Sequence, residues 1–202
     1  MDFAAINGGA LKFLRTVLCI TACGVTAAAG TITYTETITT SGSLDGTPFA
    51  DKLVTLTLTG DTADIVNGGG GAYDLSGTLD INVAGIGSDA LLDPAEVQVY
   101  QSSHDAGFFA DGVKVLFTDN FSFGTYALAT PIGPLTGGSI GVTGSPYDTA
   151  TGGTFSLAGP INEDHPAKFT ASAAATVPEP GTYLLAFGAL AGAWAVRKFR
   201  VR

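Results

Sequence analysis

Polar and apolar residues alternate along residues 31–38 of this 202-residue chain, with one exception. Threonine occupies every odd position from 31 to 39, and apolar residues fill the even positions from 32 to 38, apart from Glu36. Successive side chains of a strand point to opposite faces, so a period of two that is rich in β-branched residues predicts a strand with one hydroxyl face. The same alternation predicts strands at 54–59 and 78–83.

Weaker alternation predicts six further strands, separated by turn signals such as Asp45-Gly46 and Asp111-Gly112. Asp119-Asn120 is expected to form a tight hairpin, because it lies between two apolar runs. The further strands are expected at 96–101, 113–118, 121–128, 139–143, 154–158 and 168–173.

The chain between its two ends shows no sustained helical period. Many antiparallel strands at this spacing predict an all-β fold, an antiparallel β-sandwich of which the jelly roll is one form. We place this β-sandwich domain at residues 30–170, followed at 171–177 by a linker rich in Ala, Ser and Thr.

The last part of the chain begins with a proline-flanked segment. Proline fixes φ, lacks an N–H and pushes the preceding residue toward extended geometry, so two prolines here form a stiff, non-helical handle. A processing enzyme can recognise such a handle by its shape. The handle consists of Val177, Pro178, Glu179, Pro180 and Gly181.

An uncharged stretch follows and predicts a short transmembrane helix at 182–196, with Tyr183 and Trp194 near its two ends. The uncharged run from Gly181 to Val196 measures roughly 24 Å as a helix, against a hydrocarbon core of about 30 Å. It can therefore span if its basic neighbours snorkel or the bilayer thins. The positive-inside rule places the basic tail at 197–202 in the cytoplasm. The tail supplies a membrane stop made of Arg197, Lys198, Arg200 and Arg202.

A Pro-Glu-Pro handle, a short apolar helix and a basic end, over 178–202, resemble the PEP-CTERM sorting signal of Gram-negative bacteria that make exopolysaccharide. The resemblance implies recognition by an exosortase and processing near Pro178-Glu179-Pro180. It also implies a chain that is held transiently in the inner membrane and then reaches the cell surface or the extracellular matrix. An exosortase, the inner membrane and exopolysaccharide are therefore expected partners. The alternative is an ordinary C-terminal anchor with a chance Pro-Glu-Pro.

The start of the chain has the layout of a signal peptide, at 1–29. Lys12 and Arg15 form a positive region, and an apolar run and a small-residue site follow. We expect signal peptidase to cut after Ala29, with Ala27 as the second small residue of the site, once the general export machinery has engaged the chain.

Residues 20–23 also resemble a lipobox, in which Cys23 would be acylated, and lipoprotein processing is the alternative at this end. Both cysteines of the chain, Cys19 and Cys23, lie inside the expected signal segment. We therefore expect an exported domain without a disulfide, although it enters an oxidising compartment.

Charge divides along the same borders. Between residues 30 and 177 the chain carries three lysines against sixteen acidic residues. Such a surface repels nucleic acid and anionic lipid headgroups, so no nucleic-acid partner is expected.

Catalytic chemistry is sparse in this sequence. His104 and His165 each have an acid beside them, but neighbours along a strand point to opposite faces, and no nucleophile is placed near either histidine. We predict no catalytic residue and no enzymatic activity.

Metal-ligand spacing of the Cys/His kind is absent from the sequence. A Ca²⁺ ion needs six to eight oxygen ligands drawn from several loops, and only scattered aspartates offer them. No cofactor is expected apart from this weak calcium alternative. Its candidate ligands are Asp61, Asp64, Asp89 and Asp93.

An exported, acidic, Thr-rich sandwich without catalytic residues suits a structural or adhesive protein of the cell surface or matrix. The alternative is a carbohydrate-binding or carbohydrate-cleaving sandwich that acts on exopolysaccharide. It requires an aromatic platform or two carboxylates across a groove. The aromatic residues available for a platform are Tyr100, Phe108, Phe109 and Tyr147.

Overall fold

The computed structural model describes residues 30–141, 143–158, 161 and 164–173. Within them the chain forms a 13-stranded antiparallel sheet and two short 3-10 helices, η1 (Thr62–Asp64) and η2 (Phe121–Thr125). The prediction of an all-β antiparallel domain is confirmed. The strands are β1 (Thr31–Leu44), β2 (Thr47–Asp61), β3 (Val66–Gly69), β4 (Ala72–Gly77), β5 (Leu79–Val83), β6 (Gly87–Ala90), β7 (Ala95–Tyr100), β8 (Asp105–Ala110), β9 (Val113–Asp119), β10 (Ile132–Ile140), β11 (Tyr147–Asp148), β12 (Thr154–Leu157) and β13 (Ala167–Ala173).

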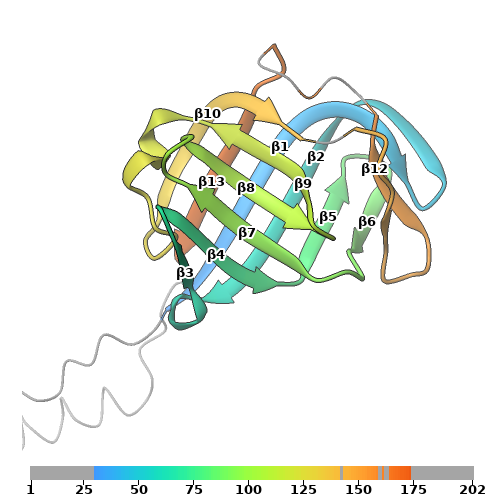
Figure 1. Ribbon diagram of the computed structural model, residues 1–202. Helices are drawn as coiled ribbons and strands as arrows, with labels where there is room; N and C mark the ends of the chain where they lie inside the picture. The colour runs from blue at the N-terminus through green and yellow to red at the C-terminus, as the bar shows by residue number, and fades with distance from the viewer. Residues whose placement is uncertain (1–29, 142, 159–160, 162–163, 174–202) are drawn as a thin grey trace, which may run out of the picture.

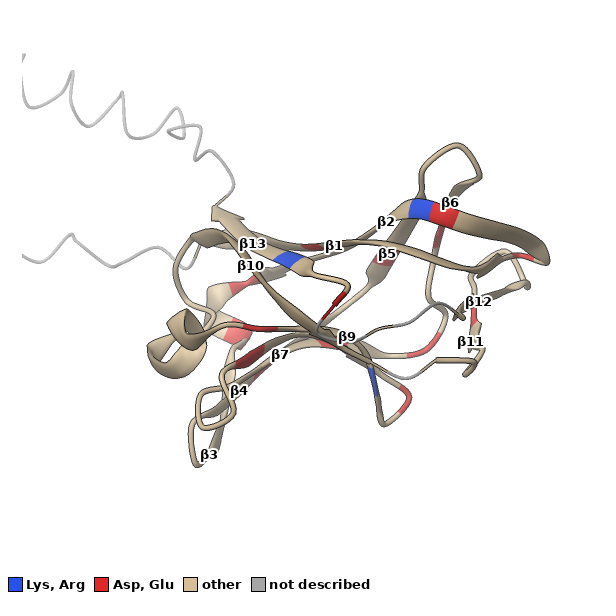
Figure 2. Cartoon of the chain, turned by 90° about the horizontal axis from the view of Figure 1, so that it is seen from above, with Lys and Arg blue, Asp and Glu red and all other residues tan. Residues whose placement is uncertain are grey.

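The sheet is one curled surface whose two halves face each other like the layers of a sandwich (Figures 1 and 2). Its strand order is β3-β4-β7-β8-β9-β10-β13-β1-β2-β5-β6, and β12 joins β1 from the side. We call β13, β1, β2, β5 and β6 layer A, and β3, β4, β7, β8 and β9 layer B. Six of the ten neighbour pairs in this order are consecutive strands, and the other four, β4-β7, β10-β13, β13-β1 and β2-β5, join strands that do not follow each other in the chain.

Strand β10 carries the chain from one layer to the other. Its first part pairs with β13 as far as Gly137, and its last part, from Gly138 to Ile140, pairs with β9. A Cβ at Gly137 would collide with the backbone carbonyl oxygen of Asp119, so only glycine allows the two strands to approach here. On the opposite side of the domain, Thr78 alone links β4 to β5.

Burial on β1 follows the predicted alternation. Tyr34 and Ile38 are buried, and Thr33 and Thr35 lie half-buried on the outer face. The two layers enclose a continuous apolar core, in which each fully buried leucine or phenylalanine contributes about 1.5–3 kcal/mol. Its fully buried members include Val54, Leu56, Leu58 and Leu79 from layer A and Val97, Val99, Phe108 and Leu116 from layer B.

The predicted strand at 121–128 and the hairpin at Asp119-Asn120 are wrong. The Asn120 side chain accepts a hydrogen bond from the Ser122 backbone N–H at 2.9 Å and begins η2 at that point. Asparagine side chains favour such local caps over strand pairing. The helix turns Phe123 into the core and leaves Phe121 86% exposed.

The expected signal peptide and C-terminal helix lie outside the described residues. Within the described part of the chain, no helix has the length and apolarity needed to cross a membrane. Strand β13 continues to Ala173, which lies inside the segment expected as a linker.

Candidate functional site

Two rows of outward side chains cross the five strands of layer A. Each row consists of direct cross-strand partners, which the antiparallel register of the strands places on one face. We call the two rows together the hydroxyl face. The first row is Lys168, Thr37, Thr55, Asn82 and Ser88. The second row is Thr170, Thr35, Thr57, Asp80 and Ala90.

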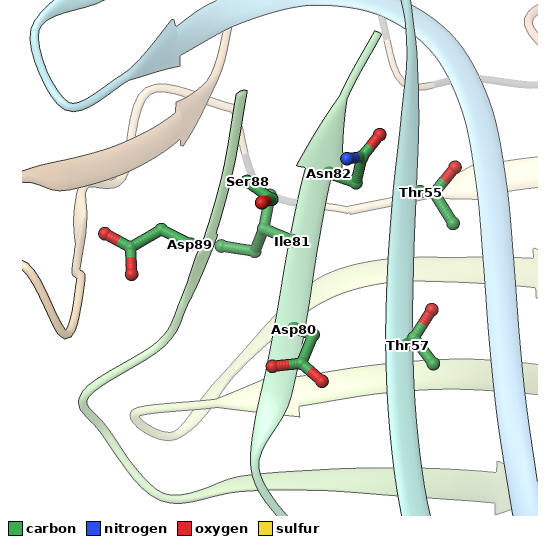
Figure 3. Close-up of a pocket in the computed structure, with 7 residues that line it drawn as sticks. All are labelled: Thr55, Thr57, Asp80, Ile81, Asn82, Ser88 and Asp89. Carbon is green, nitrogen blue, oxygen red and sulfur yellow. The ribbon is translucent and has the colours of Figure 1, made fainter. Parts of the chain in front are cut away.

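A shallow hollow of about 230 Å³ opens on the hydroxyl face over β2, β5 and β6 (Figure 3). The edge strand β6 contributes only the small residues Ser88 and Ala90 to the two rows, so Asn82 and Asp80 have no bulky neighbour on that side. The hollow is lined by Thr55, Thr57, Asp80, Ile81, Asn82, Ser88 and Asp89.

The polar side chains of the hollow have unused hydrogen-bonding capacity. In the described part of the chain, no intramolecular hydrogen bond engages the side chains of Thr55, Thr57, Asp80, Asn82 or Ser88. Thr33 and Thr59 form the next pair along β1 and β2 on the same face, and their hydroxyls, by contrast, hydrogen-bond each other at 2.9 Å. The hollow can therefore offer donors and acceptors to a ligand, whereas that neighbouring pair is already satisfied.

Asp89 lines the same hollow but is engaged elsewhere. It pairs with the buried Ile81, and in Figure 3 its carboxylate points away from Asp80. The Thr151 hydroxyl donates to this carboxylate, and the Ala90 backbone N–H donates to it at 2.7 Å. These hydrogen bonds lower the pKa of Asp89 to about 2, and the one from Thr151 has the largest effect.

The four calcium candidates are not brought together into one site. Asp61 caps η1 by accepting from the Ala63 N–H at 2.9 Å, and Asp64 lies in that short helix. Asp89 lies in β6, and Asp93 follows in the connection to β7. Among the described residues, no group of three or more His, Cys, Asp or Glu side chains could hold a metal ion.

The aromatic residues expected as a platform do not form one. Phe108 and Tyr147 are buried in the core. Tyr100 stacks on the buried Phe117 with ring centroids 6.1 Å apart, and Phe109 is half-buried. The exposed ring is instead Phe121, which the sequence reasoning assigned to a strand.

Of the two histidines, His104 has left-handed backbone geometry with φ of 62°. Its ring contacts Phe121, with centroids 4.8 Å apart. His165 lies just before β13.

The outer face of layer B carries a polar network that is bonded within itself. Tyr100 donates to Gln98 at 2.6 Å, and Gln98 donates to Glu96 at 2.7 Å. Lys114 forms an ion pair with the nearly buried Asp105 at 3.1 Å, and its ammonium lies 4.5 Å from the centroid of the Phe117 ring. These side chains of layer B are thus already engaged with one another.

Glu36 is a buried ionisable residue that was not among the site residues predicted from the sequence. Glu36 is fully buried, and its Oε1 accepts from the Thr118 hydroxyl at 2.6 Å. Its Oε2 has no hydrogen-bond partner among the described residues. Burial raises the pKa of Glu36 well above its usual range, although the Thr118 hydrogen bond opposes this shift. The sequence pattern could have indicated its burial, because Glu36 occupies a position that is otherwise apolar in the alternating segment.

The sorting residues 177–181, the membrane stop at 197–202, and Ala27 and Ala29 lie outside the described residues. Comparison with protein families finds one match there: residues 176–200 fit the PEP-CTERM protein-sorting motif. Searches among curated proteins and among solved structures find no match.

The chain therefore carries a PEP-CTERM sorting motif, as the order of its C-terminal residues predicted. The motif marks the chain as an exported protein with a membrane-anchored sorting signal and as a substrate of an exosortase.

Proposed function

We propose that this chain is a structural or adhesive protein of the cell surface or extracellular matrix. A signal peptide directs it into the general export machinery, the C-terminal segment holds it in the inner membrane, and exosortase processing releases it. The observation that carries the proposal is the sorting motif at 176–200. The curled sheet supports the adhesive part, because it presents a broad hydroxyl-rich surface on a domain with few basic residues.

The sorting step can be tested in the native host by replacing Pro178, Glu179 and Pro180 together with alanine. We expect export to continue but release to stop, because the stiff handle is lost while the apolar helix remains. Cell fractionation and immunoblotting should find the uncut chain in the membrane.

Thr182→Ala, which leaves the Pro-Glu-Pro handle intact, is the matched control and should be released normally. Unchanged release of the triple variant would contradict sorting through this motif.

Carbohydrate binding is the second candidate function, and the hollow on the hydroxyl face is the observation that favours it. Cleavage of a glycan would require two carboxylates facing each other across the substrate. Asp80 and Asp89 both line the hollow, but Asp89 points away and is bound to Thr151. We therefore favour binding over cleavage.

Assays of reducing ends, with the purified full-length chain and polysaccharide from the native host, separate these two forms of the second candidate. We expect no increase over a reaction without protein. A steady release of new ends that disappears in Asp80→Asn would instead establish cleavage.

A further inference from the structure

We propose that the hydroxyl face is a docking surface for a neutral polysaccharide, whose ring hydroxyls exchange hydrogen bonds with the side chains of the hollow. This inference rests on the carbohydrate-binding function proposed above, and it names the ligand class and the contact residues.

The donors and acceptors of the hollow identify the ligand chemistry. The Asp80 carboxylate only accepts, the Asn82 amide both donates and accepts, and the hydroxyls of Thr55 and Thr57 do either. The ligand must therefore present donors and acceptors side by side. Adjacent hydroxyls of a sugar ring do so. A fully deprotonated anion such as sulfate offers no donor for Asp80, and an ammonium group offers no acceptor for Asn82.

Charge selects a neutral glycan. On the hydroxyl face the charged side chains are Asp80, inside the hollow, and Lys168, three strands away at the other end of the rows. An acidic polysaccharide would meet Asp80 at the hollow and an excess of carboxylates over the whole domain.

The two rows favour a chain of sugars over a single sugar. Five neighbouring strands at about 4.8 Å spacing give each row a length of about 19 Å. Thr35 and Thr37 continue the hydroxyl surface from the hollow toward β13, and their hydroxyls form no hydrogen bond within the described residues. No aromatic side chain lines the hollow, so hydrogen bonds must provide the binding. Such contacts are individually weak in water, and we expect a dissociation constant on the order of 1 mM for a hexasaccharide.

The test measures binding of cellohexaose, maltohexaose and mannohexaose to the full-length chain in detergent by ligand-observed NMR, with hexagalacturonate as the acidic comparator. At least one neutral hexamer should bind, and hexagalacturonate should not. Thr57→Val and Asn82→Ala should each weaken that binding about fivefold, because each removes a hydrogen bond. Thermal melts of both variants check that they remain folded.

Thr59→Val is the matched control, because Thr59 lies on the same strand and the same face but its hydroxyl is paired with Thr33. We expect this variant to bind like the parent chain. Neutral binding that survives Thr57→Val and Asn82→Ala, or that Thr59→Val weakens equally, overturns the site while carbohydrate binding stands. Equal binding of hexagalacturonate overturns the selection for neutral glycans. Absence of binding to all three neutral hexamers overturns this inference and the carbohydrate-binding function together, and leaves the sorting function to its own test.

Discussion

The two outer faces of the curled sheet both carry the polar side chains of alternating strands, but these side chains are bonded differently on the two faces. On layer B the outward polar side chains bond one another, as in the row Tyr100–Gln98–Glu96 and the pair Lys114–Asp105. On layer A the outward threonines around the hollow form no such bonds within the described residues. Side-chain length explains much of the difference, because the long side chains of Tyr100, Gln98 and Glu96 reach each other along β7. The short threonine hydroxyls of layer A bond at the pair Thr33 and Thr59, whereas those of Thr55 and Thr57 beside the hollow form no bond in the part of the chain that the structure describes. A face of short hydroxyl side chains thus remains available to a partner.

The largest loss of stability should come from a substitution at Gly107, in strand β8 of layer B. A Cβ at Gly107 would collide with the Leu116 carbonyl oxygen and lie 2.9 Å from the buried Glu36 Oε2. Gly107→Ala should therefore lower the free energy of unfolding by about 3 kcal/mol, measured by urea denaturation. Gly30→Ala is the control, because a Cβ there meets nothing within 4 Å, and it should change stability by less than about 0.5 kcal/mol. Equal effects would contradict this account of layer B.

Paired substitutions on the two faces test the comparison directly. Lys114→Met removes the partner of Asp105, whose side chain is 7% exposed, and should cost about 2 kcal/mol of unfolding free energy. Thr57→Val removes an unpaired hydroxyl and should change stability by less than about 0.5 kcal/mol. Chemical denaturation of both variants gives the two values. If Thr57→Val lowered the unfolding free energy more than Lys114→Met, the contrast between bonded side chains on layer B and unbonded hydroxyls on layer A would be wrong.

Glu36, which is buried in the interior behind the hydroxyl face, should make the stability of the domain depend on pH. Its pKa is raised in the folded state above the ordinary value of 4.5, so the folded chain binds the proton more tightly than the unfolded chain does. Stability relative to Glu36→Gln is therefore greatest below that value. It falls by about 1.4 kcal/mol per pH unit as the pH rises toward the folded pKa, and then becomes constant. Denaturation of both proteins between pH 4 and 8 measures the difference.

Thr118→Val provides the complementary variant, because it removes the hydrogen bond that opposes the pKa rise. The pH range over which stability falls should then extend further upward. If the difference between the parent chain and Glu36→Gln does not change with pH, the carboxyl is not held protonated in the core.

Local pattern predicted the elements whose two faces differ sharply in polarity. The strands containing 31–40 and 54–59 were found where threonine alternates with apolar residues. Strands β4 and β8 were missed, because Ala72–Gly77 and Asp105–Ala110 lack a clean alternation, and β8 contains a bulge after Phe108. The pattern predicts a strand at 121–128, where η2 forms instead, because the phenylalanines carry more weight in a period-two pattern than one capping asparagine does.

The hollow could not be predicted, because it depends on which residues of β2, β5 and β6 become cross-strand partners. A shift of one residue in that register would turn Asp80 and Asn82 to the other face of the sheet. Nor does sequence spacing show that Glu36 meets Thr118, 82 residues away.

The sequence by itself determined the sorting of this protein and the hydroxyl side of β1, because a linear motif and a period-two strand are both written in consecutive residues. Only the tertiary structure decided which hydroxyls share a hollow, which polar groups pair on layer B and which carboxyl lies in the core. These depend on long-range register and on the turn of β10 between layers, and both follow from how distant strands bury their apolar sides together.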